Sequence, residues 1–159
     1  VFGLAERLNV DRKEAKALID GYFENYPNVK AYMDQSIQEA REKGYIETIF
    51  KRKRYLPDIN SKNAVVRGYA ERNAINAPIQ GSAADIIKVA MIRIYQRFQE
   101  EGIRSKMILQ VHDELNFSVL PEEKEKVQQI VISEMEAAYK MKAPLRADHG
   151  WGQNWLEAH

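Results

Sequence analysis

The stretch Met107-Ile-Leu-Gln-Val-His-Asp-Glu-Leu-Asn-Phe-Ser-Val119 decides the fold that we expect for this chain. On both sides of its centre, apolar residues recur at every second position, which is typical of strands buried on one face. These positions are Met107, Leu109 and Val111 before the centre and Leu115, Phe117 and Val119 after it. The stretch therefore predicts two antiparallel strands joined by a turn at His112-Asp113-Glu114.

This turn contains neither glycine nor an Asn-Gly pair, although tight hairpins normally use one of them to reach positive φ. Departures from local rules tend to occur at functional sites. The turn is either a polar tip in solvent or a place where Asp113 holds Mg²⁺, which takes one or two carboxylates plus substrate phosphates. Two-metal phosphoryl transfer needs carboxylates from more than one chain segment, so Asp113 and Glu114 would form only part of such a site.

Composition narrows the class of protein. The 159 residues, 45% hydrophobic and 30% charged, are typical of one globular domain. The net charge of +1 means that any binding of nucleic acid must depend on local clusters of charge. The absence of cysteine excludes disulfides and thiolate metal sites. With no apolar run near the roughly 20 residues of a membrane span and no leader, we expect a cytosolic protein without membrane contact.

The order of elements predicts an α+β fold, in which a helical hairpin precedes a small antiparallel sheet packed against helices. Asp11 and Glu14 indicate a helix start, Pro27 separates this helix from the next, and Gly44 ends the second. Further along we expect a strand over residues 45–50, a helix over residues 62–75 interrupted by Pro78, and a helix from about residue 82 to Gly102. Another helix from Pro121, a third strand over residues 145–149 and a tail held by its two tryptophans complete the chain.

Two clusters of polar residues are candidates for contact with nucleic acid. Lys51-Arg-Lys-Arg54 is either a solvated loop or a contact with phosphates, which would position a duplex without reading its sequence. Arg72, Asn76 and Gln80 recur every four residues and therefore share one helix face. They are either an ordinary polar face or donors to the minor-groove acceptors, which occupy similar places in every base pair.

Four segments together resemble the C-terminal end of family A DNA polymerases of the bacterial polymerase I type. The resemblance covers essentially the whole chain, and the order and spacing of the segments make it highly specific. The segments are Arg54-Tyr-Leu-Pro-Asp-Ile59, Ala70-Glu-Arg-Asn-Ala-Ile-Asn-Ala-Pro-Ile-Gln-Gly-Ser-Ala-Ala-Asp-Ile-Ile-Lys88, Gln110-Val-His-Asp-Glu-Leu115 and Asn154-Trp-Leu-Glu-Ala-His159.

The resemblance implies a template-directed DNA polymerase that uses primer-template DNA, deoxynucleoside triphosphates and two Mg²⁺ ions. Asp113 then matches a metal-binding catalytic aspartate, Glu114 its acidic neighbour and His112 a histidine near the primer end. Residues 1–44 resemble the last helices of the fingers, and residues 45–159 the later part of the palm. DNA contacts are implied for Arg72, Asn76, Gln80, Arg52, Lys53 and Arg54.

The chain departs from the family pattern in two ways. Lys51 stands where the family has a glycine, so we expect the loop to bend differently and the DNA contacts of Arg52 and Lys53 to be less secure. The family's other catalytic aspartate and its nucleotide-binding helix belong before Val1. We therefore expect a fragment that is inactive by itself, that self-associates through exposed apolar surface, and whose parent works in the bacterial cytoplasm at the nucleoid.

Two other functions remain as alternatives. One is a non-enzymatic module that binds duplex DNA through the basic run and the Arg72 face. The other is a small metal hydrolase built on His112, Asp113, His149 and His159, which requires the first and third strands to be neighbours.

Overall fold

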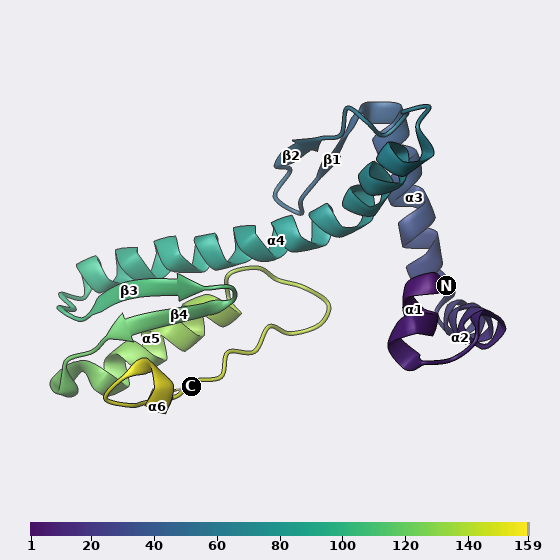
Figure 1. Ribbon diagram of the computed structural model, residues 1–159. Helices are drawn as coiled ribbons and strands as arrows, with labels where there is room; N and C mark the ends of the chain where they lie inside the picture. Colours follow the sequence, from purple (N-terminus) through teal and green to yellow (C-terminus); the bar gives the residue numbers. More distant parts are fainter. Residues whose placement is uncertain (159) are drawn as a thin grey trace. The chain divides into compact units, whose positions relative to one another are not determined.

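The protein is described here by a computed structural model that covers residues 1–158. The α-helices are α1 (Phe2–Leu8), α2 (Arg12–Asn25), α3 (Pro27–Lys43), α4 (Ala64–Glu100), α5 (Lys124–Glu136) and α6 (Trp155–Ala158), and a 3-10 turn, η1 (Pro121–Glu123), precedes α5. The strands are β1 (Tyr45–Glu47), β2 (Lys53–Tyr55), β3 (Lys106–Val111) and β4 (Glu114–Ser118) (Figure 1). The predicted α+β class is confirmed. The chain packs as two units, Val1–Ile79 and Gln80–His159, whose boundary falls within α4.

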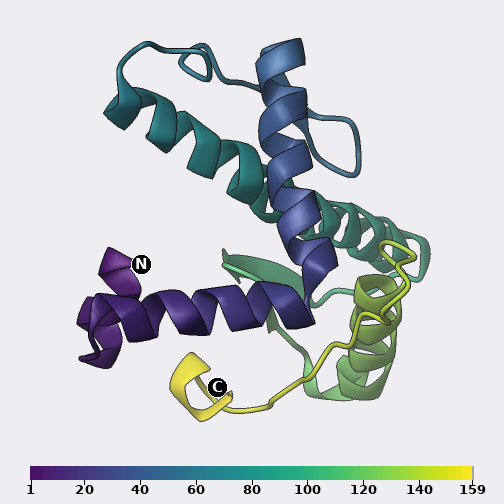
Figure 2. The same ribbon diagram turned by 90° about the vertical axis from the view of Figure 1, so that its right-hand side faces the viewer.

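In the first unit, the helix ends follow the capping signals of the sequence. The Asp11 side chain accepts a hydrogen bond from the Glu14 backbone N–H at 2.8 Å, which caps α2. Pro27 is the first residue of α3, and Gly44 ends it with a φ of 77°. Only Tyr26 separates α2 from α3, and Figure 2 shows the two axes meeting at a steep angle. The predicted helical hairpin is therefore wrong, because one linking residue cannot reverse the chain.

The core of the first unit lies where α3, the β1–β2 hairpin and the start of α4 meet. Strands β1 and β2 pair antiparallel, with Ile46 opposite Arg54. An ion pair of 2.6 Å between Arg41 and Glu71 links α3 to α4. The buried side chains of this core are Ala40, Ile46, Leu56, Ile59, Ala70, Ala74 and Ala77.

Helix α4 is a single helix of 37 residues, so the predicted interruption at Pro78 is wrong. Proline removes one backbone hydrogen bond and bends a helix, but neighbouring groups can satisfy the freed carbonyls. Tyr32 of α3 contacts the helix next to this position, since its hydroxyl donates to the carbonyl of Ile75, the residue after Ala74, at 3.1 Å. The helix ends as predicted just before Gly102, which has a φ of 65°.

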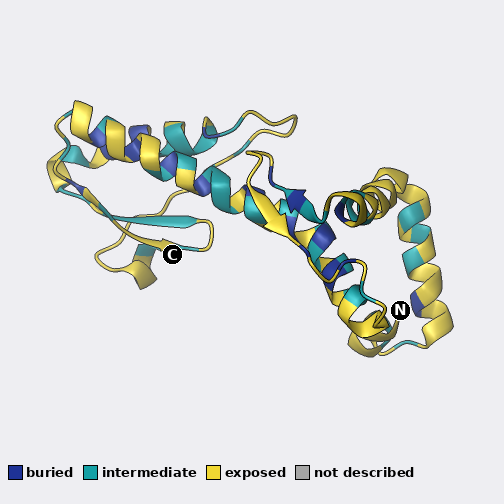
Figure 3. Ribbon diagram, turned by 90° about the horizontal axis from the view of Figure 1, so that it is seen from above, coloured by how far each residue is buried: buried dark blue, intermediate teal, exposed yellow. Residues whose placement is uncertain are grey.

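In the second unit, the later part of α4 and helix α5 cover one face of the β3–β4 hairpin (Figure 1). The buried positions form narrow bands along the helices, with exposed residues on the other sides (Figure 3). Full burial of a side chain such as Ile94 or Val127 stabilises the fold by about 1.5–3 kcal/mol. The apolar positions of α5, which are Val127, Ile130, Val131 and Met135, belong to this core, as does Ala138 just after the helix.

The hairpin contains a β-bulge that the sequence pattern did not reveal. Met107 pairs with Phe117 but Leu109 pairs with Asn116, so Ile108 is an extra residue on β3. Directly opposed residues share a face, and an extra residue exchanges the faces of all later positions. Met107 therefore packs on the core with Phe117, whereas Leu109 lies on the other face and is 50% exposed. The expectation that Leu109 and Val111 share the buried face with Met107 is wrong.

The predicted third strand is also wrong. Residues 144–150 are irregular, and within residues 1–158 the strands pair only as β1–β2 and β3–β4. One of the two tryptophans holds the tail as predicted, since the Trp151 Nε1–H donates to the Gln128 Oε1 at 3.1 Å. Trp155 is 52% exposed. Among the helices within residues 1–158, none combines the length and hydropathy that crossing a bilayer requires.

Candidate functional site

The tip of the β3–β4 hairpin carries the predicted catalytic residues. Val111 and Glu114 form its last pair, which leaves His112 and Asp113 as the two residues of the turn. Glu114 is therefore the first residue of β4. The sequence analysis had placed it in the turn, and that placement is wrong. His112 has a φ of 53° and takes the left-handed conformation that glycine usually supplies. The Gln110 side chain donates to the His112 carbonyl at 3.1 Å, which braces the turn.

The base of the same hairpin is fixed by a hydrogen-bonded cluster around the buried Ser105, which the sequence analysis missed. The Glu123 carboxylate accepts hydrogen bonds from the backbone N–H groups of Arg104 and Ser105 and from the Ser105 hydroxyl. The Ser105 hydroxyl oxygen accepts the Leu120 N–H at 3.0 Å. The hydrogen bond from the Ser105 hydroxyl, followed by that from the Arg104 backbone, lowers the pKa of Glu123. The acidic start of the predicted helix at Pro121 was the only signal in the sequence.

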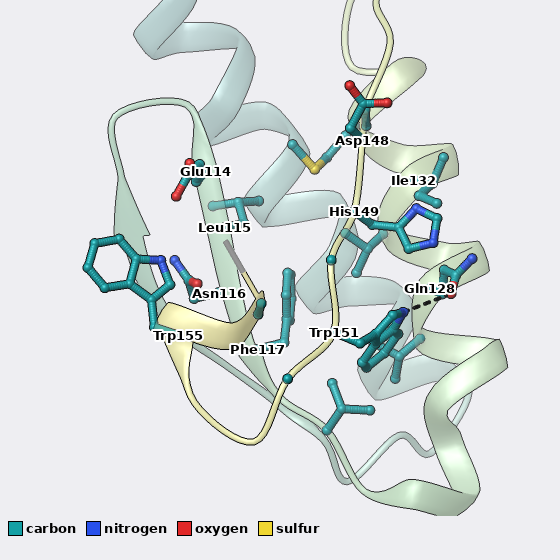
Figure 4. Close-up of a pocket in the computed structure, with 18 of the residues that line it drawn as sticks. Glu114, Leu115, Asn116, Phe117, Gln128, Ile132, Asp148, His149, Trp151 and Trp155 are labelled. Atoms are coloured by element: carbon teal, nitrogen blue, oxygen red, sulfur yellow. Dashed lines mark hydrogen bonds between the residues drawn. The ribbon is translucent and has the colours of Figure 1, made fainter.

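A pocket of about 680 Å³ lies beside the hairpin, between β4, α5 and the C-terminal segment. In Figure 4, His149 lies beside Gln128 and Ile132 of α5, away from Glu114 on β4. The Lys124 ammonium lies 4.6 Å from the centre of the Trp151 ring and helps to hold the segment against α5.

The donor set at the hairpin tip suits a hard cation such as Mg²⁺, because both of its carboxylates, on Asp113 and Glu114, offer oxygen ligands. Residues 1–158 contain no group of three His, Asp or Glu side chains placed to hold a metal. His112, Asp113 and His149 therefore do not form the metal cluster of the hydrolase alternative, and His159 lies outside the described residues. The tip can supply part of a magnesium shell, with other ligands needed to complete it.

The predicted DNA-contacting residues of α4 are all exposed. Arg72, Asn76 and Gln80 follow one another at four-residue spacing within the unbroken helix, and none is buried. The Arg72 guanidinium lies 5.9 Å from the centre of the Tyr69 ring, within the range of a cation–π contact. Arg72 and Asn76 belong to the first unit, whereas Gln80 and the hairpin tip belong to the second.

The basic run forms the turn and second strand of the β1–β2 hairpin. Lys51 has a φ of 65°, so it adopts the left-handed conformation itself, and the expectation of a different bend is wrong. The buried Thr48 hydroxyl accepts the N–H groups of Phe50 and Arg52 at 3.3 and 3.2 Å, which fixes the turn. The Lys53 ammonium lies 4.2 Å from the centre of the Tyr45 ring, and its hydrogen bond to the Tyr45 side chain raises the pKa of Lys53.

The fold is that of part of a polymerase domain. It superimposes with a TM-score of 0.96 on the POL domain of Pol1 from M. smegmatis, solved in complex with DNA primer-template and dNTP. The two chains are 45% identical, and the match covers 99% of this chain and 28% of the other. The family model for DNA polymerase family A matches residues 1–157, and the chain therefore belongs to that family.

Curated relatives give the same assignment. The chain is 53% identical over 157 residues to DNA polymerase I of Streptococcus pneumoniae serotype 4. It is 50% identical to that of Bacillus caldotenax and 46% identical to that of Bacillus subtilis. Each of these matches covers 99% of this chain and 18% of the relative, so the chain spans about a fifth of the length of these polymerases.

Proposed function

We propose that this chain forms part of a DNA-directed DNA polymerase, which adds deoxynucleotides from their triphosphates to the 3′ hydroxyl of a primer on a template. The observation that carries the proposal is the hairpin tip, where two rigid strands present Asp113 and Glu114. The POL domain of M. smegmatis Pol1, solved in complex with DNA primer-template and dNTP, supports the choice of substrates. Residues 1–44 act as the last helices of the fingers, and residues 45–159 as the later part of the palm.

Asp113 is the metal ligand of this chain, and Glu114 is its acidic neighbour. When bound, two Mg²⁺ ions lower the pKa of the primer hydroxyl and neutralise the leaving pyrophosphate. The hairpin contributes rigidity, since an ordered strand pair holds the Asp113 carboxylate in one place, and positioning is the main source of catalysis in phosphoryl transfer. His112, fixed in the turn beside Asp113, contacts the primer end.

Asp113→Asn in the intact polymerase tests this proposal. Asparagine keeps the size of the side chain and removes its charge, so the hairpin persists while a metal ligand is lost. The fall in kcat for primer extension should exceed the roughly 10–100-fold that is typical of residues that hydrogen-bond to a metal ligand. The matched control is Asp148→Asn, on the irregular C-terminal segment, which should leave kcat unchanged. Equal rates for Asp113→Asn and wild type would refute the assignment.

DNA binding is assigned to the exposed side chains of α4 and of the basic turn. Arg72, Asn76 and Gln80 donate to minor-groove acceptors and so detect duplex shape without sequence. Arg52, Lys53 and Arg54 contact phosphates, and removing one phosphate contact should reduce the slope of log affinity against log salt by about 1. Arg54→Gln is the cleanest variant for this measurement, because Arg54 lies on exposed strand β2.

A non-enzymatic role as a duplex-binding module is the second candidate. The exposure of Arg72, Asn76 and Gln80 supports it, because binding through them needs no metal. The two roles differ in one measurement. Loss of primer extension in Asp113→Asn with unchanged duplex affinity supports the polymerase, whereas unchanged extension leaves only the binding module.

We further propose that residues 1–159, prepared by themselves, lack polymerase activity and self-associate. Within residues 1–158, β4 pairs only with β3, and a second, unpaired strand edge favours association with another chain. Sedimentation at rising concentration should show dimers or larger oligomers, and a monodisperse monomer at high concentration would contradict this. The polymerase itself is assigned to the bacterial cytoplasm at the nucleoid, where its DNA substrate lies.

A further inference from the structure

Tyr32 makes a contact between two helices that the proposed function leaves unexplained. Its side chain extends from α3 to α4, and its hydroxyl donates to the backbone carbonyl of Ile75 at 3.1 Å. The two residues lie 43 positions apart in the chain, so this is a tertiary contact within the first unit. The next residue after Ile75 is Asn76, one of the exposed side chains assigned to DNA.

The contact falls beside Pro78, the proline inside α4. Pro78 has no backbone N–H, so the Ala74 carbonyl loses its regular helical donor, and the proline ring pushes against that carbonyl. The adjacent Ile75 carbonyl has as its helical donor the N–H of Ile79, the first residue beyond the proline. Helices bend at such places. A donor that binds the Ile75 carbonyl from outside the helix therefore restrains α4 beside Pro78.

Other contacts join the same two helices and support the position of Tyr32 beside α4. Ala40 of α3 and Ala74 of α4 are both 0% exposed and belong to the same buried core. The ion pair of 2.6 Å between Arg41 and Glu71 joins the same two helices. Tyr32 is only 38% exposed, so part of its ring is also packed.

We propose that Tyr32 is a positioning residue for DNA binding. By holding the Ile75 carbonyl, it fixes the local direction of α4 and with it the direction in which Asn76 extends relative to Arg72. Tyr32 need not contact DNA to do this. The inference rests on the proposed function, since it assigns Tyr32 a role only if Asn76 contacts primer-template.

Tyr32→Phe in the intact polymerase is the direct test, because it removes one oxygen and keeps the packed ring. Affinity for a primer-template duplex should fall by about 3–10-fold, the effect of one hydrogen bond. Tyr22→Phe is the matched control, since Tyr22 is a 50% exposed residue of α2 in the same unit, and it should leave affinity unchanged. Unchanged affinity in Tyr32→Phe would overturn the proposal.

A double-mutant cycle separates positioning from a general loss of stability. If Tyr32 acts through Asn76, Tyr32→Phe weakens binding in wild type but has no further effect in the Asn76→Ala background. An equal loss in both backgrounds would show that Tyr32 does not act through Asn76 and would overturn the proposal. If Asn76→Ala alone leaves duplex affinity unchanged, the assigned DNA contact fails first and the proposal fails with it. Failure of Tyr32→Phe alone would leave that contact intact.

Discussion

The Glu123 carboxylate binds Ser105 twice, through the Ser105 backbone N–H at 2.8 Å and through its hydroxyl at 2.6 Å. Ser105 lies just before β3, and its hydroxyl oxygen also accepts the N–H of Leu120, just after β4. One partly buried carboxylate thus joins the two ends of the hairpin whose tip holds Asp113. The hairpin depends on this clamp because an isolated two-stranded sheet is at best marginally stable.

The Glu123 clamp should make stability sensitive to acid. Because the pKa of Glu123 is lowered in the folded protein, its stabilising effect is complete above the unfolded value of about 4.3. The effect is lost as the pH falls through the lower folded pKa. Glu123→Gln should therefore reduce the free energy of unfolding at neutral pH and flatten its fall below about pH 5. Urea unfolding at a series of pH values measures both effects.

Glu122→Gln is the control for this prediction. Glu122 is the neighbouring glutamate, but its side chain is 58% exposed and pairs with Arg104 on the surface. Such pairs contribute little, about 0–1 kcal/mol, so the pH dependence should stay close to that of wild type. Parallel pH curves for Glu123→Gln and wild type would show that the clamp does not stabilise the fold.

Lys51→Gly should stabilise the protein. A residue with a side chain loses about 1–2 kcal/mol in the left-handed conformation, which Lys51 adopts with a φ of 65°. Glycine removes this strain but gives the unfolded chain about 0.4–1 kcal/mol more entropy to lose. The net gain in the free energy of unfolding should be about 0.5–1 kcal/mol. Lys51→Ala removes the same charge but keeps the strain. An equal gain in the free energy of unfolding for Lys51→Ala would show that the loss of charge, and not the relief of strain, stabilises the protein.

His112→Gly should distinguish the contribution of the turn conformation to stability from the contribution of the imidazole ring to activity. Glycine accepts the φ of 53° found at His112, so the hairpin should form at least as well as in wild type. If the ring binds near the primer end, kcat for primer extension should fall by about tenfold, equivalent to a single hydrogen bond of about 1.4 kcal/mol. His112→Val is the opposite control, because a β-branched residue disfavours positive φ, and it should lower the unfolding temperature. Full activity in His112→Gly would exclude a role for the ring.

Gly150→Ala should displace the C-terminal helix α6. A Cβ atom at Gly150 would lie 1.9 Å from the Ala158 carbonyl oxygen, which backbone atoms cannot tolerate. We expect altered fluorescence of Trp155 and a lower unfolding temperature. Gly21→Ala is the matched control, since a Cβ there meets nothing within 4 Å. Because Gly21 lies inside helix α2, alanine should stabilise the protein by about 0.5–1 kcal/mol. Identical spectra for Gly150→Ala and wild type would contradict the close packing.

Local signals in the sequence predicted most of the elements and the hairpin tip. Asp11, Pro27 and Gly44 marked helix ends correctly because caps depend on neighbouring backbone groups. The errors arose where contacts between residues far apart in the sequence determine the secondary structure. Pro78 suggested two helices, but α4 continues through it, and Tyr32 of another helix contacts the nearby Ile75 carbonyl. The third strand failed because a strand needs a partner, which no local pattern reveals. The bulge at Ile108 was hidden because alternation alone does not report register.

Some residues of the candidate site could be predicted from the sequence, and others could not. Asp113 and Glu114 became candidates because the predicted turn lacked glycine, and in the structure His112 adopts the positive φ that glycine would supply. The Lys51 turn was misjudged for the same reason, since a rare conformation was assumed to require glycine. Glu123 and Ser105 carried no motif, because their role depends on bringing the two ends of the hairpin together.

Because of the extra residue at Ile108, the hairpin has apolar side chains on both of its faces. Met107, Leu115 and Phe117 lie against the helices, while Leu109 is turned to the opposite face. Strands with apolar residues on both faces are typical of the inner layer of a protein. The hairpin that presents Asp113 is therefore shaped as a middle layer, and the rigidity of its tip depends on what covers its second face as well as on its own two strands.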